Sequence, residues 1–250
     1  WASSQSPHTQ RNLFAESLAP LGFTHKDVRV IAPPIGGGFG GKAGVSMEIL
    51  AAAIATKVRG NPIKVIWSRE QEFYNTSQRL GVIAMLKIGV KNDGTFTAIN
   101  HRLYWDTGAS AEYGANVVNA VGLSAIGPYR FHNVSIDSVC LYTNLPPCGA
   151  YRGFGYSEFM FGLESHINRI ADHLNIDAVE IRKINAIKEN DILAYGVEMN
   201  PNGLIECIDK VAKEIEWGKE AKSDDPNIKV GKGFSLIWKA PAMPPNASSA

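Results

Sequence analysis

A run of glycines around a single phenylalanine constrains this chain more than any other feature. Residues 36–42 read Gly-Gly-Gly-Phe-Gly-Gly-Lys, between a predicted strand and a predicted helix. Glycine has no Cβ, so it adopts backbone conformations closed to other residues and lets another group approach the main chain. Five glycines around one Phe are more than a turn needs. We therefore expect the bare backbone to offer N–H groups to a large anionic or polar ligand.

Two phosphate-binding motifs overlap with this run. Gly36, Gly38 and Gly41 satisfy the G-x-G-x-x-G pattern of dinucleotide-binding turns, but Glu70, which follows the next predicted strand, lies too far along the chain to bind the ribose. The start of a P-loop also fits, except that Ala43 stands where the Ser or Thr that binds magnesium belongs. An NAD-binding dehydrogenase domain therefore remains only a weak alternative.

A second glycine–phenylalanine motif lies at another predicted strand-to-helix junction. Residues 150–155 read Ala-Tyr-Arg-Gly-Phe-Gly. Arg152 carries a permanent, planar charge that can bind an oxyanion or stack on a ring. Phe154, between two glycines, is suited to stacking on a flat substrate or cofactor. The alternative is that Phe154 is only the first core residue of the following helix and Arg152 makes a local contact.

Charge and cysteine content limit the function classes. The chain has 25 Lys and Arg against 24 Asp and Glu, and this near-neutral total argues against nucleic acid as a partner. No apolar stretch is long enough to predict a membrane span. The three cysteines are widely spaced without a C-x-x-C pair, which argues against a disulfide framework, a zinc knuckle or an iron–sulfur cluster and favours a reducing, cytoplasmic setting.

Hydrophobic patterning predicts an α+β fold of mixed sheets with packed helices. Strands are expected over residues 28–33, 62–67, 82–91, 95–105 and 134–141. Helices are expected over residues 7–19, 45–58, 154–174 and 204–215, with Asp177 capping a further helix. Asn92-Asp93-Gly94 predicts a hairpin, whereas residues 108–127 have no clear period. The helix over 45–58 is apolar nearly all round, so we expect it to be buried.

The pattern also predicts a domain layout. Residues 1–218 are expected to form one domain, residues 219–230 a polar linker, and residues 231–250 the first strand of a second domain. Because the chain starts without Met and stops just after an apparent strand, we expect an N-terminally truncated piece of a longer protein.

Together the two motifs resemble the signature stretches of the molybdopterin-binding large subunit of the xanthine dehydrogenase/aldehyde oxidase family of molybdenum hydroxylases. Residues 36–42 and 150–155 match in order and spacing, and residues 3–7 resemble a third segment of the family. The resemblance implies the family's molybdopterin-binding fold for residues 1–218 and a second domain of that type from residue 231. It also implies molybdenum–molybdopterin as the cofactor, either in its plain form or as the cytosine dinucleotide.

The resemblance assigns roles position by position. Gln5 matches the glutamine that binds an oxygen ligand of molybdenum, and Arg152 and Phe154 match the arginine near the metal and the aromatic ring that stacks on the substrate. The backbone cradle would comprise Gly37, Gly38, Phe39, Gly40, Gly41, Ala150 and Gly153. The substrate pocket would be lined by Ala43, Phe154, Ala240 and Pro241. No side chain is expected to bind the metal directly, because the pterin dithiolene holds it.

The reaction implied by the resemblance is hydroxylation with water as the oxygen source. It requires a general base, which the family supplies from a Gly-Glu pair near the end of the molybdenum subunit. No Gly-Glu pair occurs in this sequence, and Glu48 and Glu158 are expected to be ordinary helix residues. We therefore expect the C-terminal remainder of the subunit to carry the base. A [2Fe–2S] iron–sulfur subunit and an FAD subunit would take the electrons, in a cytoplasmic heteromer.

Departures from the family pattern narrow the substrate. Purine-oxidising relatives carry Glu where Ala43 stands and Arg in the stretch that resembles residues 108–114, which has none. Loss of both polar groups argues against a purine and leaves an aldehyde, an aromatic or an N-heteroaromatic compound. Gly153 stands where the carbon-monoxide-oxidising branch has Cys. A catalytically incomplete binding or scaffold subunit remains the alternative, because the base is missing.

Overall fold

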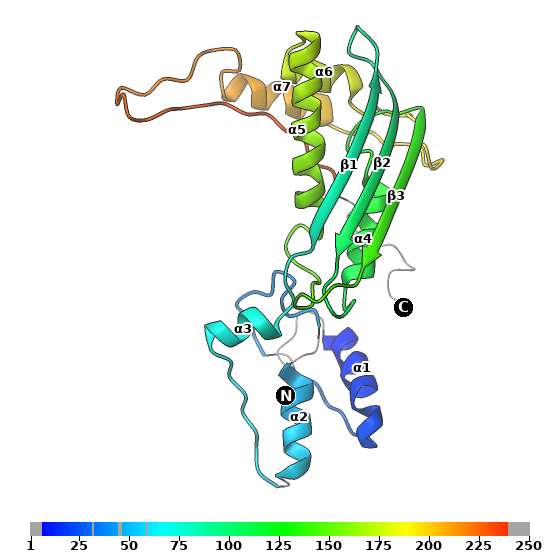
Figure 1. The fold of residues 1–250 in the computed structure, drawn as a ribbon, viewed down its shortest axis with the longest axis vertical. Coiled ribbons are helices and arrows are strands. Elements are labelled where there is room, and N and C mark those ends of the chain that lie inside the picture. The colour runs from blue at the N-terminus through cyan, green and yellow to red at the C-terminus, as the bar shows by residue number, and fades with distance from the viewer. Residues whose placement is uncertain (1–6, 32, 45–46, 59, 240–250) are drawn as a thin grey trace.

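The computed structural model describes residues 7–31, 33–44, 47–58 and 60–239. Figure 1 shows an elongated molecule with the N-terminal helices at one end and a sheet with packed helices beyond them. The elements in chain order are α1 (Pro7–Leu18), η1 (Ala19–Leu21), α2 (Met47–Lys57), α3 (Arg69–Asn75), β1 (Gly81–Val90), β2 (Phe96–Asp106), α4 (Gly114–Ser124), β3 (Asn133–Leu141), α5 (Tyr156–Leu174), α6 (Ala178–Asn185) and α7 (Leu204–Glu214). The predicted α+β class is confirmed.

A three-stranded mixed sheet forms the centre. β1 pairs antiparallel with β2, and β2 pairs parallel with β3. The predicted hairpin is confirmed: Gly94 adopts φ 85°, and the side chain of Asp93 accepts a hydrogen bond from the N–H of Thr95 at 2.9 Å. The strand predicted over residues 134–141 is also confirmed. Because β2 and β3 run in parallel, the chain must cross over between them, and this crossover contains α4.

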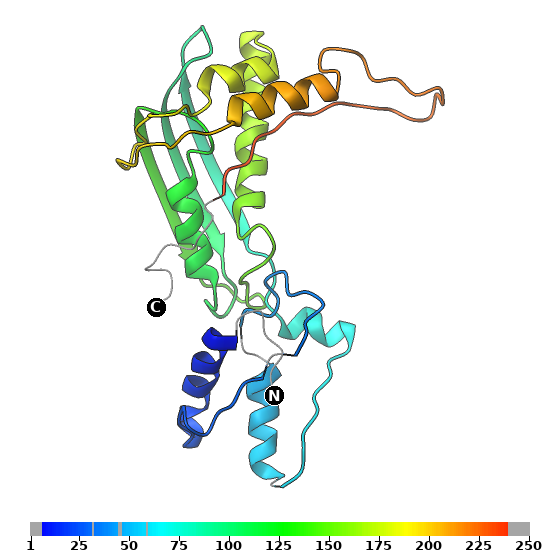
Figure 2. The same cartoon turned by 180° about the vertical axis from the view of Figure 1, so that it is seen from behind.

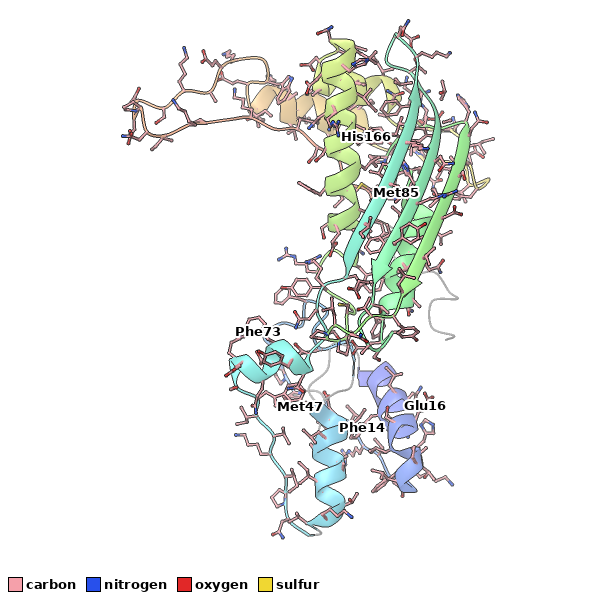
Figure 3. The ribbon with its side chains drawn as sticks, viewed as in Figure 1. Phe14, Glu16, Met47, Phe73, Met85 and His166 are labelled. Atoms are coloured by element: carbon pink, nitrogen blue, oxygen red, sulfur yellow. The ribbon has the colours of Figure 1, made fainter. Side chains whose placement is uncertain are left out.

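Helices α4 and α5 pack on the sheet and form the main core, as Figure 2 shows from behind. Leu103 and Trp105 of β2 are fully buried there with Val121 of α4 and Phe159 of α5. On the other side of β1, Ile83 and Met85 are exposed, and Figure 3 labels Met85 on this strand. The alternation of exposed and half-buried residues along β1 is what a sheet covered on one side requires.

A buried ion pair fastens α5 to α6. Arg182 of α6 donates to Glu164 of α5 at 2.8 Å, and both side chains are almost completely buried. Glu164 also accepts hydrogen bonds from the Tyr129 hydroxyl at 2.5 Å and from the Leu236 N–H at 2.9 Å. The predicted cap of α6 is confirmed, because the Asp177 carboxylate accepts from two N–H groups at the start of the helix. The Glu164 carboxylate thus joins four segments: α5, α6, the loop with Tyr129 and the extended segment with Leu236.

The N-terminal helices have a small core of their own. Ala15, Leu18 and Val28 are buried, with Ile49 of α2 packed against them. Figure 3 shows Phe14 on α1 and Met47 at the start of α2. Contrary to the prediction, no residue of α2 is fully buried. Among the described elements, α2 packs mainly against α1, and a contact on one side cannot cover a helix that is apolar nearly all round.

Several predicted elements are wrong. Residues 28–31, 33 and 62–67 contain no strand, because these extended segments lie without a neighbouring strand to bond. Residues 231–239 also run extended without strand pairing among the described residues. There Phe234 packs with α7, and Leu236 bonds Glu164.

Helix α4 was not predicted, because its many small residues hide its period. A Cβ on Gly122 would lie 3.1 Å from the Cβ of Ser138, so small size lets α4 pack closely on β3.

None of the helices in the described ranges is both long and apolar enough to cross a bilayer. The domain boundaries at residues 218 and 230 remain a prediction. The segment after α7 is polar and largely exposed, as a linker would be.

A buried histidine leads to a prediction about acid stability. His101 of β2 is fully buried, and its ring lies 6.1 Å from that of Phe159. Within the described part of the chain, neither ring nitrogen has a hydrogen-bond partner of good geometry. Burial lowers the pKa of His101 to about 4; the charge of His166 adds to this, and the backbone of Asn100 opposes it.

Between pH 6.5 and 4 the unfolded chain therefore binds a proton that the folded chain excludes. The stability that neutral His101 contributes should fall by roughly 3 kcal/mol as the pH drops through this window. His101→Phe should flatten this part of the pH profile in urea unfolding. Parallel profiles for wild type and variant would contradict the assignment.

Candidate functional site

The two glycine–phenylalanine loops, far apart in sequence, meet in the structure. The first loop comprises residues 36–44, and the second comprises residues 149–155, before α5. A Cβ on Gly40 would overlap the carbonyl of Ala150 and lie 2.8 Å from the Cα of Tyr151. Only glycine permits this approach of the two backbones. The two motifs therefore lie in direct backbone contact, at Gly40 and Ala150.

Both phenylalanines adopt the same unusual backbone conformation. Phe39 and Phe154 each have φ 53°, a left-handed conformation that residues with a side chain rarely take. The adjoining Gly40 and Gly153 each have φ 100°. Such backbone costs about 1–3 kcal/mol per residue and tends to gather at functional sites. Phe154 lies just before α5, which begins at Tyr156, and it is half-buried against the main core, so both the stacking role and the alternative of a core residue stay predictions.

The contact between the loops borders a pocket of about 300 Å³. Seven residues predicted for the site line it: Phe39, Gly40, Ala43, Ala150, Arg152, Gly153 and Phe154. Two further lining residues, Tyr113 and Tyr151, were not predicted. A larger cavity of about 380 Å³ lies elsewhere, beside Tyr129, and contains none of the motif residues. We assign the candidate site to the smaller pocket because the motifs and the strained backbone converge there.

Charge and aromatic surface lie together at this pocket. The guanidinium carbon of Arg152 lies 5.8 Å from the centre of the Phe39 ring, within the range of a cation–π contact. The Phe39 ring is 63% exposed, so one face of this pair is open to a ligand. An exposed aromatic ring and an arginine suit a flat, anionic molecule.

Two backbone N–H groups of the first loop form hydrogen bonds within the loop itself. The N–H of Gly41 donates to the carbonyl of Gly38 at 3.0 Å, and the N–H of Ala43 donates to that of Gly40 at 2.9 Å. Gly37 lies beneath the Phe39 ring, where a Cβ would come within 2.6 Å of Cε2. The first loop therefore offers fewer backbone N–H groups to a ligand than its glycine count suggested, because those of Gly41 and Ala43 bond within the loop.

Three predicted site residues lie outside the described residues. They are Gln5, Ala240 and Pro241, and their roles remain predictions. Glu48 and Glu158, expected to be ordinary helix residues, lie in the first turns of α2 and α5. Glu158 is paired with Arg79 at 2.5 Å. The described residues contain no group of three or more His, Cys, Asp or Glu that could hold a metal ion.

Sequence reasoning missed Arg79, which lies just before β1 and holds the second loop. Its guanidinium donates to the carbonyl of Arg152 at 2.8 Å and to the Ser157 hydroxyl at 2.9 Å. It also pairs with Glu158 and lies 4.2 Å from the centre of the Tyr151 ring. These contacts span more than 70 positions of sequence, so no local motif signals them.

Arg79→Lys should loosen the second loop, because a lysine cannot reproduce the fork of donors that reaches two oxygens at once. We expect a stability loss of about 1–2 kcal/mol in urea unfolding. The matched control is Arg69→Lys on α3, whose side chain is exposed and pairs only with Glu72. Equal effects of the two substitutions would show that Arg79 does not support the loop.

Comparison with known proteins identifies the family. The family described as the molybdopterin cofactor-binding domain matches residues 1–186. The chain is 36% identical over 240 residues to the putative xanthine dehydrogenase molybdenum-binding subunit XdhA of Escherichia coli, covering 94% of this chain and 32% of that protein. It is 35% identical over 213 residues to the nicotinate dehydrogenase large molybdopterin subunit of Eubacterium barkeri, covering 85% of this chain and 49% of that protein.

A solved structure gives the same answer. The aldehyde oxidoreductase of Desulfovibrio gigas superposes with a TM-score of 0.79 at 26% identity, covering 86% of this chain and 23% of that one. The chain thus spans between about a quarter and a half of the length of these proteins. An NAD-binding domain is not supported, since the sheet is mixed and, among the residues that the structure describes, no strand leads into the glycine loop. The chain belongs to the molybdopterin cofactor-binding family of molybdenum hydroxylases, with xanthine dehydrogenase and aldehyde oxidase among its relatives.

Proposed function

We propose that this chain supplies the cofactor-facing loops of a molybdenum hydroxylase that oxidises an aldehyde or an aromatic or N-heteroaromatic compound, with water as the oxygen source. The observation that carries the proposal is the meeting of the two strained glycine–phenylalanine loops, at Gly40 and Ala150, beside one pocket. Neither loop alone would offer an aromatic ring, an arginine and bare backbone to one ligand.

The described residues fit a pterin cofactor. The backbone of the first loop comes close enough to the second that any side chain at Gly40 would fill the space. Arg152 supplies a permanent positive charge for an anionic group, and the exposed Phe39 supplies a flat apolar surface. When bound, the molybdenum cofactor would supply the redox centre that takes two electrons from the substrate. Gln5 would donate an amide hydrogen bond to it, and Gly37, Gly38, Gly41 and Gly153 would shape the loops around it.

Phe154 orients the substrate in this proposal, because its left-handed backbone holds the ring at the turn before α5. Ala43 lines the same pocket without a polar group, which disfavours a purine. Ala240 and Pro241 would complete the substrate wall. The related nicotinate dehydrogenase subunit is consistent with an N-heteroaromatic substrate, and the related aldehyde oxidoreductase with an aldehyde.

The partners follow from the same proposal. A carboxylate base on the remainder of the molybdenum subunit, a [2Fe–2S] subunit and an FAD subunit would complete the reaction, in the cytoplasm and without nucleic acid or membrane. The pterin would be either plain or the cytosine dinucleotide. In the proposed layout, residues 1–218 form the cofactor domain, residues 219–230 a linker, and residues 231–250 begin a second domain. Because the sequence has no Gly-Glu pair, a catalytically incomplete scaffold subunit is the second candidate.

Phe154→Ala distinguishes a substrate-stacking ring from a structural one. We expect kcat/KM of the intact complex to fall roughly ten- to a hundredfold, because a stacked ring contributes to substrate orientation, while molybdenum per chain stays near the wild-type value. The control is Phe161→Ala, a ring on α5 that is 78% exposed and does not line the pocket. Parallel loss of molybdenum and turnover would make Phe154 a structural residue.

A further inference from the structure

A carboxylate lies behind the pocket, between the ends of the two loops. Glu112 belongs to the connection between β2 and α4. Its Oε1 occupies the place where a Cβ on Gly44 would stand, and a Cβ on Gly149 would lie 2.6 Å from its Oε2. Gly44 ends the first loop and Gly149 begins the second. The two glycines make room for one side chain that touches both loops.

The neighbours of this carboxylate form the walls of the pocket. Ala43 precedes Gly44, Ala150 follows Gly149, and Tyr113 follows Glu112, and all three line the pocket. Glu112 itself is not among the lining residues. Its position therefore affects the pocket through the spacing of these walls and not through contact with a ligand.

The surroundings of Glu112 disfavour its charged form. Glu112 is an exposed residue, but the protein around its carboxylate reduces hydration and raises its pKa, and the charge of Glu48 on α2 adds to this. On its own loop, the pKa of Tyr113 is raised by burial and by Glu112. On the side of Gly149 the nearest side chain is Ser77, which carries no charge. Glu48 and Tyr113 are the titratable groups that act on this site among the described residues.

We propose that Glu112 is a positioning residue that, when protonated, holds the Gly44 end of the first loop against the Gly149 end of the second, and that its ionisation loosens this contact. An effect of Glu112 on molybdenum retention rests on the proposed function, whereas its effect on the contact between the loops does not. Because the folded-state pKa is raised above the ordinary 4.5, the contact is most stable at acid pH. It weakens as the pH rises through the raised value.

Hydrogen exchange tests this contact without reference to activity. The N–H groups of Gly41 and Ala43 hold the first loop in shape, so their protection reports its order. The experiment uses the intact molybdenum subunit in its purified complex and compares wild type with Glu112→Gln at pH 5 and pH 8, corrected for intrinsic exchange. Glu70→Gln, an exposed glutamate on α3, is the control.

Wild type and Glu70→Gln should lose protection at these two amides by about threefold or more between pH 5 and pH 8. Glu112→Gln should keep the same protection at both values, because its amide fills the space without ionising. Glu48→Gln should reduce the loss, since the carboxylate repulsion is gone. Equal pH dependence in wild type and Glu112→Gln, or no pH dependence in wild type, would overturn the proposal.

Molybdenum content in the same samples separates this proposal from the proposed function. Wild type should retain less metal after gel filtration at pH 8 than at pH 5, and Glu112→Gln should retain equal amounts. Absence of molybdenum from every sample would overturn the proposed function, and the exchange result would still decide the role of Glu112. Equal metal loss in both proteins at pH 8 would overturn the consequence drawn for the cofactor.

Discussion

Gly40→Ala is expected to force the two glycine–phenylalanine loops apart. The added methyl would meet the Ala150 carbonyl and the Tyr151 Cα, and it would be attached to a backbone at φ 100°. The left-handed conformation costs an alanine roughly 1–2 kcal/mol, and the steric overlap adds roughly 1–3 kcal/mol. We expect a total loss of about 2–5 kcal/mol in urea unfolding, together with loss of most of the molybdenum from the purified complex.

Gly36→Ala provides a matched control in the same loop. A Cβ at Gly36 meets nothing within 4 Å, and its φ lies outside the left-handed region. This substitution should change stability by less than about 0.5 kcal/mol and leave the metal content unchanged. If the two alanine variants behaved alike, the close approach of the loops at Gly40 would be wrong.

Arg182→Ala should give the largest loss of stability, about 3–5 kcal/mol in urea unfolding. The Arg182 side chain is completely buried and bonds Glu164, Asn168 and the carbonyl of Ala178. Its removal leaves the Glu164 carboxylate buried without its counterion. The Glu164 carboxylate also binds Tyr129 and Leu236, so the damage should extend from α6 to the segment after α7.

Lys183→Ala is the control for this experiment, because Lys183 is the next residue on α6 and its pair with Asp209 is partly exposed. A cost below about 1 kcal/mol is expected there. Combining Arg182→Met with Glu164→Gln should recover part of the stability, since the amide oxygen can accept from the Leu236 N–H while the amide NH2 donates to the Tyr129 hydroxyl. A cost below about 1 kcal/mol for Arg182→Ala itself would contradict the buried pairing.

Local chemistry made the central elements predictable. The Asn92-Asp93-Gly94 turn fixed the hairpin, and regular apolar spacing indicated α5 and α7. Helix α4 could not be found this way, because Gly114 and Gly122 serve close packing against β3 and against Thr107, just after β2, and not a helical pattern. The extended segments at residues 28–31, 33 and 62–67 look like strands locally, but strand formation depends on a neighbour that the pattern does not reveal.

At the candidate site, too, some residues could be predicted from the sequence and others could not. Phe39 and Phe154 could be predicted because their glycine neighbours are visible in the sequence and match a family pattern. The groups that support them could not be. Arg79 and Glu112 reach the loops from distant segments, and their role depends on tertiary contacts with Arg152 and Gly149. Motifs thus predicted residues that line the pocket, and the structure was needed to identify those that hold them.

The most direct test of the account is the molybdenum and pterin content of the purified complex that contains this chain, measured in parallel for wild type, Gly36→Ala and Gly40→Ala. The account predicts near-stoichiometric molybdenum with pterin in wild type and Gly36→Ala, and a large loss of both in Gly40→Ala. An active wild-type preparation without molybdenum, or full metal content in Gly40→Ala, would contradict the claim that the two joined loops bind the cofactor.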